Sequence, residues 1–319
     1  MTSDRFAFPP SDQTVFLTDG GLETTLVFLE GVDLPCFAAF PLLRSGEGRA
    51  KLENYFAPFI RTAVERDVGF ILDTPTWRAN PDWAAKLSVS PEELMDINQE
   101  AVRWAARVRD RLSDNRERVL INGVVGPRGD GYRADAQMTA EEAQAYHALQ
   151  VEAFREAGAD MVSAITMNYV EEAVGIARAA EALGMPVVVS FTVETDGRMA
   201  SGESLQSAIE RTDRETGHIP AYYMINCAHP THFDDILSGS DEWIQRIRGL
   251  RANASAKSHA ELDESTELDA GDPLDLARRY RDLRERMKHL SVLGGCCGTD
   301  HRHIAAICDA CVPALGRAA

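Results

Sequence analysis

The sequence has no long hydrophobic run and carries little positive charge. A membrane-spanning helix needs about 20 consecutive apolar residues, and no stretch of these 319 residues approaches that length. The 33 Lys and Arg residues are outnumbered by 50 Asp and Glu residues, which gives a formal net charge of −17. Binding to a nucleic-acid backbone requires clustered Lys and Arg, so we expect neither a nucleic-acid partner nor a membrane partner.

The N-terminus has no pattern typical of a secretion signal, because Met1 to Pro10 contain no basic segment followed by an apolar core. The six cysteines are therefore not expected to form a disulfide framework. We expect a reducing cytoplasm, where thiolate–zinc chemistry persists. The chain also lacks a glycine-rich nucleotide fingerprint, so a Rossmann-type site for a methyl donor is not expected.

Three cysteines stand at the ends of two apolar, β-prone runs. Cys296 and Cys297 lie within Leu293-Gly294-Gly295-Cys296-Cys297-Gly298-Thr299, and Cys227 ends the run Tyr223-Met224-Ile225-Asn226. The glycines allow the backbone to bend so that two adjacent sulfurs can bind one ion. Three thiolates leave one position open on a tetrahedral zinc, which is the pattern of a catalytic site. The alternative is that all three are small buried hydrophobes, but the double-cysteine motif favours metal binding.

Strand-like and helix-like segments alternate along the whole chain, which predicts an α/β fold with a parallel sheet. Capping boxes at Ser90–Glu93 and Thr139–Glu142 predict two long helices that end near Leu112 and Ala157. No interdomain linker is visible, so we expect residues 1–319 to form a single (β/α)8 TIM barrel. The eight expected strands cover about 15–21, 69–76, 119–125, 160–167, 187–192, 221–227, 249–254 and 291–295.

The main shift in composition is the segment 260–272, which follows the seventh expected strand. It holds six acidic and no basic residues. We interpret it as a mobile, solvated surface loop rather than as a lid.

In parallel barrels the chemistry lies where the strands end, and polar or turn-forming residues follow most of the expected strands. The sixth and eighth strands are two apart around the ring, so their ends can reach one metal. With these motifs the chain resembles the homocysteine S-methyltransferase family of zinc-dependent barrels along nearly its whole length. The matching motifs are Asp19-Gly20-Gly21, Thr74-Pro75-Thr76, Gly126-Pro127, Asn226-Cys227 and Gly294-Gly295-Cys296-Cys297-Gly298.

The resemblance implies an S-methyltransferase that carries a methyl group from a small donor to a thiol such as homocysteine, as in methionine biosynthesis. It implies Zn²⁺ on Cys227, Cys296 and Cys297, with no catalytic side chain beyond the metal site. Asp19 would face the substrate amine, and the Gly20-Gly21 amides would lie near its carboxylate. The expected substrate-binding residues are Asp19, Gly20, Gly21, Thr74, Thr76 and Asn226.

This chemistry is consistent with general principles. A thiol near pH 7 is mostly protonated, whereas the thiolate is the nucleophile. Zinc on three sulfurs can take a substrate thiol as its fourth ligand and deprotonate it, and the thiolate then attacks the methyl group of a sulfonium, quaternary ammonium or similar donor. Trp77, Trp83 and Tyr132 are candidate cation–π partners of such a donor, although loop packing is the favoured explanation for each.

One position departs from the family pattern. After the fourth strand the family has a Glu that helps to hold the substrate amine, and Ile165 occupies this position here. Loss of a carboxylate is expected to weaken amino-acid binding by ~1.5–3 kcal/mol, the strength of a hydrogen bond to a charged group. Either another acid replaces it, with Glu23 and Glu194 as candidates, or the thiol is not an α-amino acid.

Two other functions remain open from sequence. One is a zinc lyase or hydrolase, although such sites more often use His and carboxylate ligands than sulfur alone. The other is a degenerate barrel that binds a thiol or a metal without turnover. The methyl donor and the oligomeric state are not assigned.

Overall fold

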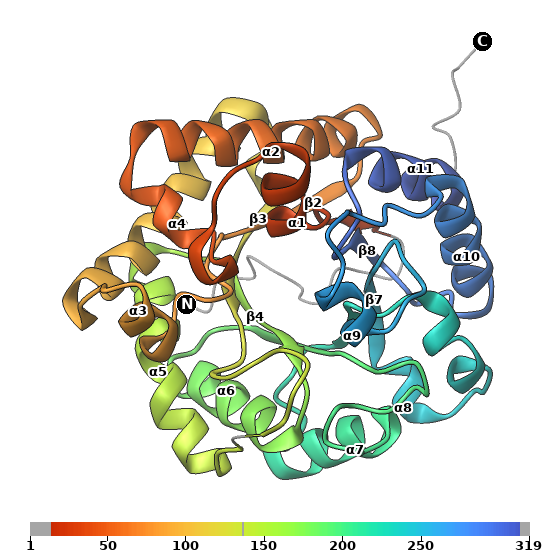
Figure 1. Cartoon of the computed structure of the whole chain (residues 1–319). Helices are drawn as coiled ribbons and strands as arrows, with labels where there is room; N and C mark the ends of the chain where they lie inside the picture. The colour runs from red at the N-terminus through yellow and green to blue at the C-terminus, as the bar shows by residue number, and fades with distance from the viewer. Residues whose placement is uncertain (1–13, 136, 313–319) are drawn as a thin grey trace.

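The computed structural model describes residues 14–135 and 137–312. Within them, eight parallel strands pair in sequence order and β8 pairs with β1, which closes the barrel (Figure 1). The prediction of a (β/α)8 TIM barrel is therefore confirmed. The strands are β1 (Phe16–Leu17), β2 (Gly69–Asp73), β3 (Val119–Val125), β4 (Met161–Met167), β5 (Val187–Phe191), β6 (Tyr223–Asn226), β7 (Ile247–Ala252) and β8 (Val292–Gly295).

Long helices form a ring outside the strands (Figure 1). The two predicted capping boxes are present, because the Ser90 hydroxyl accepts from the Glu93 N–H and the Thr139 hydroxyl accepts from the Glu142 N–H. The α-helices are α1 (Leu22–Thr24), α2 (Gly46–Glu65), α3 (Pro81–Lys86), α4 (Pro91–Leu112), α5 (Ala140–Ala157), α6 (Val170–Ala182), α7 (Leu205–Thr216), α8 (Glu242–Gln245), α9 (His259–Asp263), α10 (Pro273–Arg286) and α11 (His301–Cys311). In the described part of the chain, no helix combines the length and the apolar character needed to cross a bilayer.

The strands are almost completely buried because helices cover them outside and side chains fill the barrel inside. Ile71, Leu120 and Ile165 belong to a separate apolar cluster whose members alternate along the strands, as interior residues of a barrel do. A polar layer accompanies this cluster. Asn122 donates to Asp73 (Nδ2–Oδ1 2.7 Å) and accepts from Ser163 (Oδ1–Oγ 3.0 Å). The polar groups at the carboxyl ends of the strands therefore lie directly above a packed core.

Two expectations about the elements differ from the structure, and a third lies outside the described residues. The first strand is only Phe16–Leu17, and Asp19-Gly20-Gly21 forms the loop that leads into α1. Helix α7 was not predicted, because its sequence is polar and buries few apolar side chains, although Ser204 caps its start and Gly217 (φ 65°) ends it. Helix α11 ends at Cys311, and the predicted extension to Leu315 lies outside the described residues.

Candidate active site

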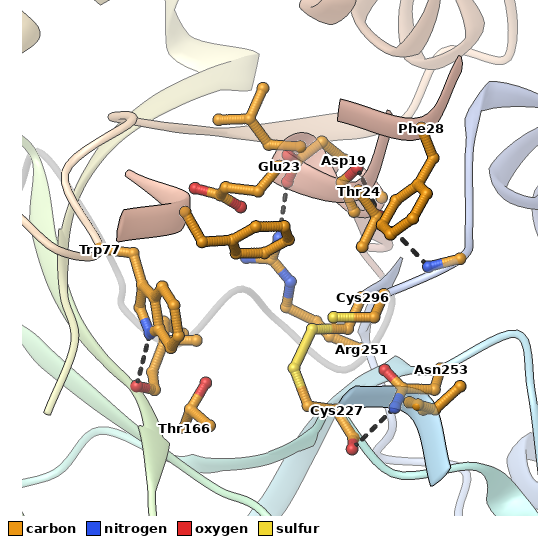
Figure 2. A pocket seen from close by; sticks show the side chains of 18 of the residues that line it. Asp19, Glu23, Thr24, Phe28, Trp77, Thr166, Cys227, Arg251, Asn253 and Cys296 are labelled. Atoms are coloured by element: carbon orange, nitrogen blue, oxygen red, sulfur yellow. Dashed lines mark hydrogen bonds and ion pairs between the residues drawn. A yellow bond between two sulfur atoms is a disulfide. The ribbon is translucent and has the colours of Figure 1, made fainter. Parts of the chain in front are cut away.

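The structure brings together the three cysteines singled out in the sequence. Cys227 directly follows β6, and Cys296 and Cys297 directly follow β8, with β7 between the two strands. The three Sγ atoms all lie within 4.8 Å of one another. Cys227 and Cys296 are joined in a disulfide with a Cα–Cα distance of 5.3 Å, and Cys297 is a free thiol (Figure 2). Their role as metal ligands remains a prediction, but their proximity is a feature of the fold.

A tight turn after β8 positions the cysteine pair. The Thr299 N–H and hydroxyl both donate to the Cys296 carbonyl oxygen, at 3.1 and 2.7 Å. Gly298 has a φ of +79°, and a Cβ at this position would lie 2.6 Å from the Asp269 carbonyl oxygen. A side chain there would be strained in its backbone and would also clash, which explains the glycine after the two cysteines.

Cys227 is held in a left-handed conformation with φ 52°. A non-glycine residue in this region costs about 1–3 kcal/mol, so its surroundings must fix it. Its N–H donates to the Arg251 carbonyl oxygen at 3.0 Å, and its own carbonyl oxygen accepts from Asn253 Nδ2 at 3.0 Å. The His259 ring also contacts this carbonyl, with Nε2 at 2.5 Å. The end of β7 and the segment that follows it therefore fix the backbone of Cys227.

A cavity of about 430 Å³ lies at the carboxyl ends of the strands, and the three cysteines form part of its wall. Its volume falls in the range of small-molecule sites. Tyr132 also lines it, with its hydroxyl 3.9 Å from Cys297 Sγ and its ring stacked on His259 at 4.1 Å. Burial raises the pKa of the Cys297 thiol to about 11. Without a metal, this thiol is therefore protonated at neutral pH.

Segment 260–272 lies at the surface as expected, since its residues are exposed or half-buried, but it also forms part of the cavity wall. The segment begins in helix α9, and its residues Leu262, Asp263 and Leu268 line the cavity. It is tied to the barrel through His259, whose Nε2 contacts the Cys227 carbonyl oxygen at 2.5 Å, and through Asp269, whose Oδ2 accepts from the Ser255 hydroxyl at 2.8 Å. Its acidic composition suggested solvent exposure, but the chain after β7 folds back over the barrel mouth.

An ion cluster that sequence analysis missed lies beside the cysteines. Arg251, in β7, donates to Asp19 Oδ1 at 2.6 Å from Nη2 and forms a second ion pair with Asp73 through Nη1. The Tyr55 hydroxyl donates to the other Asp19 oxygen at 3.0 Å. Asp19 lines the cavity as expected, but protein donors already occupy both of its carboxylate oxygens. The position of Arg251 near the carboxyl end of β7, where other strands carry site residues, was the available signal for this cluster.

Burial and charge act in opposite directions on this cluster. Burial raises the pKa of Asp19 to about 7, against the lowering effect of Arg251, and the neighbouring Asp73 raises it further. Burial lowers the pKa of Arg251, but the two carboxylates outweigh it and leave a net increase. Arg251 is therefore cationic, and the two carboxylates beside it hold its charge in the buried site.

Two of the predicted substrate-binding residues lie behind the cavity wall. The Thr76 hydroxyl donates to the Val124 carbonyl oxygen at 2.8 Å, and Thr76 is fully buried. The Asn226 side chain accepts from the Thr166 N–H (3.0 Å) and the Ser190 hydroxyl (2.7 Å), so it braces neighbouring strands. Thr74 does line the cavity, with its hydroxyl 2.6 Å from that of Thr76.

Gly20 and Gly21 line the cavity and are constrained by the turn after β8. A Cβ on Gly20 would lie 2.6 Å from the Thr299 carbonyl oxygen. The Gly21 N–H donates to that same oxygen at 3.0 Å, so this amide already has a partner. The two glycines therefore join the first strand to the cysteine turn, and a contact with a substrate carboxylate remains a prediction.

Two of the three candidate cation–π residues line the cavity, and the third does not. Trp77 and Tyr132 line the cavity, and Trp77 Nε1 donates to the Ile165 carbonyl oxygen at 3.3 Å. Trp83 lies outside the lining, where its ring packs against Arg78 and Lys86 at 4.0 and 3.7 Å. Only Trp77 and Tyr132 are therefore positioned to contact a ligand among these three.

Comparisons with known proteins identify the family and agree with the barrel fold. Residues 16–311 match the family described as homocysteine S-methyltransferase. The oxidized form of the homocysteine methyltransferase MmuM from Escherichia coli superimposes with a TM-score of 0.73 at 20% identity, covering 92% of this chain and 94% of that chain. The metallated form of the same enzyme gives 0.71 at 20% identity, covering 92% and 96%. No curated protein matches the sequence.

The structural likeness establishes the fold, and the family match covers almost all of the barrel. The cysteine cluster at the carboxyl ends of β6 and β8 provides a group that could hold a metal ion. The chain belongs to the homocysteine S-methyltransferase family and is an S-methyltransferase.

Proposed function

We propose that this S-methyltransferase uses a Zn²⁺ centre on Cys227, Cys296 and Cys297 and methylates a thiol bound beside it in the cavity. The observation that carries the proposal is the approach of the three Sγ atoms to within 4.8 Å of one another on the cavity wall. Two separate strands contribute these sulfurs, so the cluster depends on the closed barrel rather than on local sequence.

The set of donor atoms fits zinc. Sulfur-rich tetrahedral sites select zinc among the common divalent ions, and three protein ligands leave one position for substrate. Zn–S bonds of about 2.3 Å are compatible with sulfurs this close together. The disulfide between Cys227 and Cys296 withholds two of the three ligands, so binding requires its reduction. A reducing compartment such as the cytoplasm supports this requirement.

When bound, Zn²⁺ on three thiolates supplies a position that lowers the pKa of a substrate thiol. The acceptor sulfur forms its bond to the methyl carbon while the bond from that carbon to the donor atom breaks. The thiol proton is released, and an onium donor leaves as a neutral molecule. With homocysteine as acceptor the product is methionine, which would place the reaction in methionine biosynthesis.

The residues around the sulfurs suit this transfer. Trp77 and Tyr132 present aromatic groups to the cavity, and aromatic faces attract the positive charge of an onium donor. Leu262 and Leu268 extend the apolar wall over the mouth and limit the access of water. Exclusion of water strengthens a thiolate as a nucleophile, because its hydration must otherwise be removed.

The test is a matrix of thiols and methyl donors on reduced, zinc-loaded protein. Homocysteine and simple thiols are combined with S-methylmethionine, S-adenosylmethionine and betaine, and loss of free thiol is measured. We expect zinc-dependent methylation with at least one onium donor. Absence of thiol loss with every pair, together with hydrolysis of ester or amide substrates, would instead support a zinc hydrolase.

A further inference from the structure

Glu23 is a carboxylate that faces the cavity without a side-chain partner. It lies in α1, lines the cavity and is half-buried. Figure 2 shows it across the cavity from the Cys227–Cys296 pair, near Trp77. Within residues 14–135 and 137–312, its carboxylate interacts with its own backbone N–H but forms no ion pair with a neighbouring cation. Burying a charge without a partner is costly, which points to a ligand that supplies one.

Of the buried and half-buried acids that line the cavity, the others are already engaged, whereas Asp130, Asp263 and Glu267 also line it but are exposed. Asp19 and Asp73 share Arg251, as described above. Glu194, the second acid considered from sequence as a replacement at the Ile165 position, pairs with the His259 ring at 2.8 Å and does not line the cavity. Ile165 itself contributes an apolar wall. Glu23 is therefore the half-buried cavity carboxylate that is available to a cationic group.

Arg78 supplies the opposite charge on the same side of the cavity. Its guanidinium lies over the rings of Trp83 and Trp77, at 4.0 and 4.9 Å, and its Nη1 donates to the Cys36 carbonyl oxygen. Its Nε is buried and has no hydrogen-bond partner. Glu23 and Arg78 are close enough that each shifts the pKa of the other, and Asp130, also on the cavity wall, acts more strongly on Arg78, yet Arg78 forms no ion pair with either acid among the described residues. Two opposite charges therefore face one cavity with space between them.

We propose that Glu23 and Arg78 bind the amino-acid end of the thiol acceptor, with Glu23 on its ammonium group and Arg78 on its carboxylate. The inference rests on the proposed thiol methylation and assigns its acceptor to the α-amino-acid thiols. The planar guanidinium matches a carboxylate, and a carboxylate accepts strong hydrogen bonds from an ammonium group. In this arrangement Glu23 replaces the acid that is missing at Ile165, and Asp19 holds Arg251 instead of substrate.

The experiment measures binding to reduced, zinc-loaded protein by calorimetry, so turnover is not needed. Three thiols of similar length are compared: homocysteine, 4-mercaptobutanoate without the ammonium, and 3-aminopropane-1-thiol without the carboxylate. Glu23→Gln is expected to weaken homocysteine and the aminothiol about 10- to 100-fold in Kd and to leave 4-mercaptobutanoate unchanged. Arg78→Gln is expected to weaken homocysteine and 4-mercaptobutanoate by a similar factor and to leave the aminothiol unchanged.

Glu30→Gln is the matched control, because Glu30 is exposed, ends the same helical segment and does not line the cavity. It should leave all three thiols unchanged. If Arg78→Gln does not fold, Arg78→Lys is used instead, because it keeps the positive charge but lacks the planar guanidinium. It should weaken the binding of homocysteine and 4-mercaptobutanoate less than Arg78→Gln would. The proposal is overturned if Glu23→Gln affects the three thiols equally, affects none of them, or raises only the KM of the methyl donor.

Failure of the proposed function is a separate outcome. If zinc-loaded protein binds the three thiols in the expected order but methylates none of them, the amino-acid site stands and the reaction assignment does not. If methylation occurs but wild-type protein prefers 4-mercaptobutanoate to homocysteine, the reaction stands and the amino-acid site is wrong.

Discussion

The two sides of the cavity differ in how their polar groups are satisfied. On the side formed by the ends of β6 and β8, hydrogen bonds fix the backbone and the three sulfurs face one another. On the side formed by α1 and the loop after β2, Glu23 and Arg78 face the cavity without an ion-pair partner among the described residues. The ion cluster of Arg251 lies between these two sides.

We assign the methyl transfer to the side with the three sulfurs and the recognition of the thiol to the side with Glu23 and Arg78. The sulfur side has its geometry set by main-chain bonds and glycines, so a motif of a few residues specifies it. The charged side depends on single side chains from distant segments, and these decide which thiol fits. A barrel of this family can therefore keep its reaction while it changes its acceptor, because the two functions depend on different structural elements.

The largest effect is expected from removal of a sulfur. Cys296→Ser should abolish stoichiometric zinc binding and lower methyl transfer by about 100-fold or more, since even the loss of a group that only orients a metal ligand costs 10–100-fold. Zinc content of the reduced protein and the rate of thiol loss measure these two effects, and circular dichroism checks that the fold is intact. Cys36→Ser is the control, because Cys36 lies outside the cluster and should retain zinc. Full zinc content in Cys296→Ser would contradict the ligand assignment.

The buried ion cluster of Arg251 should contribute more to the free energy of unfolding than an exposed ion pair. Arg251→Met leaves Asp19 and Asp73 buried without their cation, and removal of one partner from a buried pair costs about 3–5 kcal/mol. Arg107→Met breaks an exposed pair with Glu100 and should cost at most about 1 kcal/mol. Urea denaturation measures both. Equal losses would show that the buried cluster adds nothing beyond a surface pair.

The turn after β8 allows a sharper test of the sulfur side. Gly298→Ala meets both a positive φ and a carbonyl oxygen, so we expect a loss of about 2–4 kcal/mol in the free energy of unfolding and weaker zinc binding. Gly202→Ala meets a φ of +84° with nothing within 4 Å, and should cost about 1–2 kcal/mol. If both variants lose the same stability and keep the same zinc affinity, the close approach at Gly298 does not shape the site.

The smallest expected effect is that of the Glu23 charge on thermal stability. Burial raises the pKa of Glu23 from 4.5 to about 7, so the folded state binds this proton more tightly than the unfolded state. As the pH rises from about 4.5 through 7, Glu23 loses its proton and increasingly destabilises the fold. Below about pH 4.5 it is protonated in both states and has no such effect. Glu23→Gln should raise the Tm by about 2–5 °C at pH 8 and leave it unchanged near pH 4.5. A gain of the same size at both pH values would contradict an unpaired carboxylate.

Local patterns predicted the barrel and the cysteine cluster. The alternation of elements, the capping boxes at Ser90 and Thr139, and the cysteines at two strand ends are all encoded within short stretches. Strand order in a parallel barrel then places the ends of β6 and β8 on the same side of the molecule.

The charged groups of the site could not be predicted in the same way. Asp19 and Arg251 are 232 residues apart, and nothing near either residue indicates its partner. The directions of Thr76 and Asn226 depend on how the strands align, which places both behind the cavity wall. The acidic segment 260–272 suggested a solvated loop, because its composition does not indicate that the chain returns over the barrel mouth.

X-ray absorption at the zinc edge of the reduced, zinc-loaded protein tests the central claim most directly. We predict one zinc per chain with three sulfur neighbours at about 2.3 Å, and a fourth sulfur when homocysteine is added. A first shell dominated by nitrogen or oxygen, or one that does not change when the thiol is added, would contradict it.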